Sequence, residues 1–100
     1  MEEYNVKIMP LARIDALDVI DYMNTLPPED AALYFEMLTG KIEALLKSPE
    51  RCALAKDTQL RLRGYRTLPV DIYTVFLVIR GKTVEIRRIL FSREKYQWLL

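Results

Sequence analysis

Arginine and tyrosine are the side chains of this sequence best suited to chemistry, because its 100 residues include no histidine and a single cysteine. The absence of histidine excludes Ser-His-Asp triads, histidine general bases and ordinary zinc sites with histidine ligands. Cys52 has no second cysteine with which to form a disulfide within the chain, so we interpret it as a packing or loop residue. A chain of this kind suits a reducing compartment.

A basic cluster gathers in the C-terminal part of the sequence, followed by two aromatic residues. Such arginines could bind another macromolecule, such as RNA or an acidic protein segment, although arginines on a solvated strand face are also common. Arg88 lies in an otherwise apolar strand, directly before Ile89 and Leu90, which leaves an ion pair with Asp15 or Asp18 as a structural alternative. Aromatic residues near a terminus equally suit core packing or partner binding. The candidates for macromolecule binding are Arg61, Arg63, Arg66, Arg87, Arg88, Arg93, Tyr96 and Trp98.

Length and composition indicate a single domain over residues 1–100, since 51% of the residues are hydrophobic and the net charge is only +1. That charge balance argues against a protein dominated by nucleic-acid electrostatics. We find no metal-ligand spacing, glycine-rich phosphate loop or nucleophile elbow, so we expect neither metal nor cofactor. No apolar run approaches the roughly 20 residues of a membrane span, and the acidic N-terminus lacks an apolar core of signal-peptide length. We therefore expect a cytoplasmic protein without a membrane partner.

The elements that must position the basic cluster form a predicted β-meander. Runs rich in β-branched and aromatic residues at 72–79 and 83–91 are joined by Arg80-Gly81-Lys82, which predicts a hairpin, and a third strand precedes them at 65–70. The run at 72–79 is apolar on both faces, as expected of a central strand. In the last run, the apolar face changes after Ile86. Either a bulge near residues 87–88 or a strand end buried on both sides would explain this change.

The N-terminal half predicts an edge strand and a helical hairpin. Residues 4–9 alternate in hydrophobicity, and Pro10 fits the start of a helix. This first helix should bury Ala12, Ala16, Val19, Ile20, Met23 and Leu26 and point Asp15 away from the core. A second, antiparallel helix should run from the prolines at 27–28 to Lys47 and bury Ala31, Phe35, Leu38, Ile42, Leu45 and Leu46. We interpret Gly40 as a close-packing position.

Residues 52–62 have the weakest periodicity, and we expect a connecting loop with at most a short helical turn. Ser92 is a candidate N-cap for a short C-terminal helix. The predicted fold class is therefore α+β, with the order β-α-α-β-β-β-(α). It consists of an N-terminal strand, an antiparallel helical hairpin, a three-stranded antiparallel meander and the short C-terminal helix, with the helices packed on one face of the sheet.

These features together resemble the RelE/ParE superfamily of toxins from bacterial type II toxin–antitoxin modules. The resemblance spans nearly the whole chain and depends on the order and spacing of its parts. Those parts are the strand–Pro–helix opening with Ala12 and Asp15, the helical hairpin ending at Pro49, Gly64-Tyr65-Arg66 before Leu68-Pro69-Val70, Tyr73-Thr74-Val75-Phe76, and Val84-x-Ile86-x-Arg88-Ile89-Leu90 followed by Arg93 and Tyr96.

The resemblance implies a growth-inhibiting toxin that a cognate antitoxin masks. RelE-like members cut mRNA on the ribosome, whereas ParE-like members poison DNA gyrase and are not nucleases. If this chain were a nuclease, Arg66, Arg93 and Tyr96 would be its candidate catalytic residues. The nuclease pattern of lysine and arginine side chains is incomplete, because Leu68 and Thr74 occupy positions where cations are expected. We therefore favour gyrase over the ribosome and mRNA as the target, and an inactive remnant that only binds an antitoxin is a further alternative.

Overall fold

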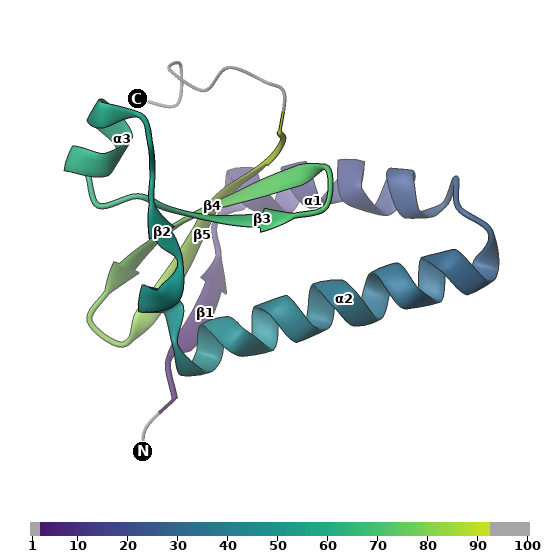
Figure 1. The fold of residues 1–100 in the computed structure, drawn as a ribbon, viewed down its shortest axis with the longest axis horizontal. Helices are drawn as coiled ribbons and strands as arrows, with labels where there is room; N and C mark the ends of the chain where they lie inside the picture. Colours follow the sequence, from purple (N-terminus) through teal and green to yellow (C-terminus); the bar gives the residue numbers. More distant parts are fainter. Residues whose placement is uncertain (1–2, 93–100) are drawn as a thin grey trace.

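The computed structural model describes residues 3–92, which form a sheet backed by two long helices (Figure 1). In chain order the elements are β1 (Asn5–Ile8), α1 (Pro10–Met23), α2 (Pro28–Lys47), the 3-10 helix η1 (Pro49–Arg51), β2 (Ala53–Leu54), α3 (Thr58–Leu62), β3 (Arg66–Val70), β4 (Tyr73–Arg80) and β5 (Thr83–Phe91). The predicted order of strand, helical hairpin and meander is confirmed. The expected C-terminal helix, with Arg93, Tyr96 and Trp98, lies outside the described residues.

The sheet has five strands in the order β1-β5-β4-β3-β2. β1 pairs in parallel with β5 at one edge, as expected for a strand that reaches the sheet by way of the helices. β3, β4 and β5 form the predicted antiparallel meander. β2 was not predicted, because a strand of two residues is too short to show any alternation. The segment expected to be a loop also contains α3, where the Asp57 carboxylate caps the helix by accepting a hydrogen bond from the Leu60 N–H at 3.0 Å.

A β-bulge at Arg87 explains the change of apolar face in β5. Phe76 lies opposite Arg88 and Leu77 lies opposite Ile86, so Arg87 has no partner in the register with β4. The inserted residue shifts the alternation by one position and brings Ile89 beside the same core as Ile86. Of the two explanations that the sequence left open, the bulge is therefore the correct one.

β4 is buried on both faces, as predicted for a central strand. On one face, Val75 and Leu77 pack with Ala12 of α1 and Leu45 of α2. On the other face, Phe76 packs with Leu60 of α3. The long helices therefore share one face of the sheet, and the short α3 partly covers the opposite face. Among the described residues, none of the helices is both long and apolar enough to cross a bilayer.

The helical hairpin departs from its predicted buried stripes at several positions. Ile20 is 50% exposed and Phe35 is 59% exposed, whereas Asp15 and Tyr34 are buried. Gly40 is not a close-packing position, because a Cβ added there would meet no atom within 4 Å. α1 and α2 run in opposite directions from the turn that joins them and diverge over the sheet (Figure 1). Because they diverge, apolar side chains on their facing sides remain partly open to solvent.

Candidate binding surfaces

An apolar groove separates α1 from α2, with the sheet as its floor. Its volume is about 390 Å³, and almost every residue lining it is hydrophobic. Ile20 and Phe35 stand at its rims, which explains why these predicted core residues are half exposed. α1 contributes Ala16, Val19, Ile20, Met23 and Asn24, α2 contributes Phe35, Leu38 and Ile42, and the floor consists of Val70, Tyr73, Val75 and Ile89. An exposed apolar groove of this kind is typical of a protein-binding site.

Three tyrosines fix the hairpin to the sheet at one end of the groove. The Tyr22 ring meets Tyr34 and Tyr73 edge to face, with centroid separations of 5.4 and 6.2 Å. The Tyr73 hydroxyl donates to the Asp18 carbonyl at 3.3 Å. Burial raises the pKa of both Tyr34 and Tyr73, and the nearby carboxylates of Asp71 and Asp18, respectively, add to this effect. These rings are therefore neutral packing groups at physiological pH.

Asp15 and Arg88 form a bidentate ion pair that ties α1 to β5. The Arg88 Nε and Nη2 donate to the two Asp15 carboxylate oxygens at 2.7 and 3.0 Å. The carboxylate also accepts the Ile89 backbone N–H at 2.9 Å. Of the two alternatives, Asp15 and Asp18, the partner of Arg88 is therefore Asp15. The prediction that Asp15 points away from the core is wrong. Arg88 serves the fold and does not contribute a free cation to a surface.

The other arginines of the basic cluster that lie within residues 3–92 are each engaged at a different place. Arg66 donates to the carbonyls of Glu50 and Cys52 at 3.2 and 2.7 Å, and so holds η1 against β3. Arg87 pairs with Glu85 at 3.1 Å and lies 6.0 Å from the centroid of the Tyr65 ring. Arg61 donates to the Lys56 carbonyl at 3.3 Å on α3. Arg63 follows α3 as its exposed C-cap.

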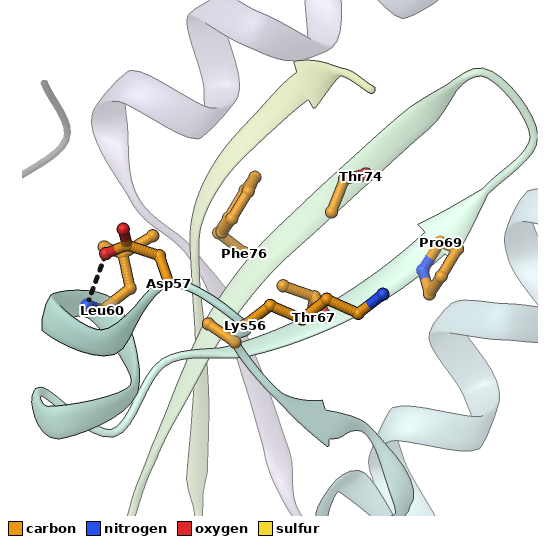
Figure 2. A pocket seen from close by; sticks show the side chains of 8 residues that line it. Lys56, Asp57, Leu60, Thr67, Pro69, Thr74 and Phe76 are labelled. Carbon is orange, nitrogen blue, oxygen red and sulfur yellow. Dashed lines mark hydrogen bonds between the residues drawn. The ribbon is translucent and has the colours of Figure 1, made fainter. Parts of the chain in front are cut away.

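A smaller hollow of about 240 Å³ lies on the other face of the sheet, beside α3 (Figure 2). Its lining residues are Ala55, Lys56, Asp57, Leu60, Thr67, Pro69, Thr74 and Phe76. Arg66 does not line it, because alternate residues of a strand point to opposite faces. Thr67 lies opposite Phe76 and shares its face, whereas Arg66 lies opposite Leu77, which packs under the helices.

This hollow offers hydroxyls, one lysine and a carboxylate already used to cap α3. Phosphoryl chemistry needs several cations aimed at one group. Lys56 is the only cation among the described residues that line the hollow. Sequence reasoning missed Lys56, because it lies in the segment without periodicity and no motif surrounds it.

The fold matches chains from two solved structures of toxin–antitoxin systems. The chain superposes on the structure of the chromosomal ParDE system from P. aeruginosa with a TM-score of 0.67 and 20% identity, covering 90% of this chain and 97% of that one. It superposes on the toxin–antitoxin complex RelBE2 from Mycobacterium tuberculosis with a TM-score of 0.56 and 24% identity, covering 89% of this chain and 98% of that one. At these identities the likeness shows the fold alone. None of the curated proteins matches the sequence.

A family model places the sequence more closely than these structures do. The model described as the ParE toxin of the type II toxin–antitoxin system parDE matches residues 6–96, which includes every helix and nearly every strand described above. The chain therefore belongs to the ParE toxin family.

Proposed function

We propose that this toxin stops bacterial growth by binding DNA gyrase, and that it does so without cutting RNA. The observation that carries the proposal is the way the arginines are used. Arg88 is paired with Asp15, Arg87 with Glu85, and Arg66 is bound to two backbone carbonyls. A ribonuclease would need such cations to stabilise a phosphate in the transition state. Cations that already hold strands and turns together suit a binding protein better.

The proposal also gives the apolar groove a role, as the site where a cognate antitoxin docks. The ParDE and RelBE2 structures are those of toxin–antitoxin systems. The groove between α1 and α2 is lined by aliphatic and aromatic side chains, and an amphipathic helix can insert its apolar face into a groove of this kind. Filling the groove would cover Ile20 and Phe35, which the protein alone leaves half exposed. An antitoxin helix would thereby complete the core of the hairpin.

A gyrase supercoiling assay tests the target. Purified protein should inhibit supercoiling or trap cleaved DNA, and addition of the purified antitoxin should reverse the effect. Unaffected supercoiling at saturating protein would refute gyrase as the target. Primer extension on translated mRNA after induction provides the opposite test, since cuts within codons would identify the protein as a ribosome-dependent nuclease. Unchanged growth after induction of the protein alone would instead identify an inactive remnant.

A further inference from the structure

The outward side of α1 carries a row of apolar side chains that residues 3–92 leave exposed. Leu11, Ile14 and Leu17 follow one another at a spacing of three residues and are 57%, 61% and 58% exposed. None of them lines the apolar groove. Ala12 and Val19, which are buried in the core, lie on the opposite side of the helix. The row is therefore a continuous apolar patch that a partner could cover.

Charges of opposite sign flank this patch. Since each helical residue turns by about 100°, Arg13 lies about 70° to one side of the line midway between Ile14 and Leu17, and Asp18 lies about 70° to the other side. Neither charge forms an ion pair within residues 3–92. The Arg13 Nε donates to the Ile8 carbonyl at 3.1 Å, which leaves both terminal nitrogens of the guanidinium available. The patch thus has a cation on one flank and a carboxylate on the other.

This order of residues is complementary to itself when two α1 helices lie side by side in the same direction. A two-fold axis along the helices brings Ile14 and Leu17 against the partner's Ile14 and the partner's Leu17. Arg13 then lies beside the partner's Asp18, five residues further on, and symmetry forms this ion pair twice. Isoleucine, then leucine, with opposite charges at these flanking positions is the arrangement found in parallel two-stranded coiled coils. An antiparallel pairing would instead place each charge beside its own copy.

We propose that two copies of this toxin associate through the outward face of α1, in this parallel arrangement. The inference goes beyond the proposed function and does not depend on the target. A second copy is favoured over another protein because the flanking charges satisfy one another across the two-fold axis. Since the apolar groove is lined by a different set of α1 residues, the pairing leaves that groove open.

The association should be weak and reversible. One exposed side of a short helix buries less than the roughly 1,200–2,000 Å² of a standard interface. Asp21, seven residues after Ile14, also meets the partner's Asp21, and these like charges repel. We therefore expect a dissociation constant of about 10–100 µM.

Sedimentation equilibrium of the whole protein tests the inference, with concentrations chosen on both sides of that constant. We expect a monomer–dimer equilibrium. Arg13→Glu and Asp18→Arg should each raise the dissociation constant at least about tenfold, because each turns two attractions into two repulsions. The charge-swapped double variant Arg13→Glu/Asp18→Arg should return to within about threefold of the unaltered protein. Both positions are exposed, so recovery by the double variant also excludes misfolding as the cause of the loss.

A gain of affinity provides an independent test. Asp21→Asn removes the repulsion across the axis and should lower the dissociation constant at least about threefold. The control Glu36→Gln, at an exposed position of α2, should leave it unchanged.

A protein that stays monomeric at all these concentrations would overturn the inference, as would single charge variants that dimerise normally or a double variant that does not recover. A monomeric toxin whose single charge variants fail to capture the antitoxin would assign this face to the antitoxin and would also refute pairing of two copies. Gyrase inhibition is measured separately, so failure of this inference is distinguishable from failure of the proposed function.

Discussion

Removing the buried Asp15 carboxylate of α1 should strongly destabilise the fold. In Asp15→Ala the Arg88 guanidinium loses two hydrogen bonds, and the Ile89 N–H loses its acceptor. The side chains of Arg88 and Asp15 are only 17% and 10% exposed, so water cannot fully replace the lost partner. Breaking a buried pair in this way costs about 3–5 kcal/mol. Because Arg88 keeps some contact with water, we expect Asp15→Ala to lower the free energy of unfolding by about 3 kcal/mol.

Urea denaturation and thermal unfolding measure this cost. A loss of this size is a large fraction of the about 5–15 kcal/mol that stabilises a typical domain. In a domain of this size, each kcal/mol lowers the melting temperature by about 4–8 °C, so the midpoint should fall by at least about 12 °C. The matched control is Asp21→Ala, an exposed carboxylate on the same helix. It should change the free energy of unfolding by no more than about 0.5 kcal/mol.

A double-mutant cycle separates the ion pair from other effects of the substitution. Arg88→Met removes the charge whose carboxylate partner is lost in Asp15→Ala, while keeping much of the apolar stem. The double variant should therefore be less destabilised than the sum of the two single variants. Strict additivity would refute the reasoning, as would a cost below about 1 kcal/mol for Asp15→Ala, since either result would mean that the pair is solvated in solution.

Three further predictions concern other parts of the hairpin. Gly40→Ala should stabilise the protein by about 1 kcal/mol in urea denaturation, because the position is helical, exposed and open to a methyl group; a loss of stability would contradict the open space. The free energy of unfolding should fall as pH rises above about 10. Burial raises the pKa of Tyr34 in the folded state, so the folded protein keeps the neutral phenol at pH values where the same residue ionises in the unfolded chain. Tyr34→Phe should reduce that fall and cost little at neutral pH, since the buried hydroxyl makes no hydrogen bond of good geometry within residues 3–92; an unchanged alkaline decline would exclude Tyr34 as its source. Ile20→Glu should prevent co-purification with the antitoxin, because Ile20 lines the apolar groove. The control Leu17→Glu should not, because Leu17 is at least as exposed but does not line the groove. Equal capture of the antitoxin by both variants would rule out docking in the groove.

The fold could be predicted from the sequence wherever a pattern extends over several residues. The strands of the meander, the prolines that open both long helices and the short Arg80-Gly81-Lys82 connection each give an independent local indication, and these agree with one another. β2 could not be found in this way, because Ala53 and Leu54 are too few to alternate. Its place in the sheet is set by pairing with β3 alone.

The sites were harder to predict, because they depend on which side chains meet. Helical periodicity assigned Asp15 to the solvent side on the basis of its charge, and only the contact with Arg88 explains its burial. Ile20 and Phe35 fit the apolar stripes, yet they line a groove that α1 and α2 leave open. The hydrophobic pattern records which side chains favour burial, and it does not record whether this chain or a partner covers them.

The pairing of β1 with β5 determines when parts of the fold can form during translation. Asn5–Ile8 is synthesised long before the strand beside it, Thr83–Phe91, because both long helices and two other strands of the meander lie between them in the sequence. Until β5 has been translated, β1 lacks the strand with which it pairs, and Asp15 has no Arg88 to bind. Contacts so distant in sequence form late and slowly. The two contacts that tie β1 and α1 to the sheet therefore form only after β5 has left the ribosome.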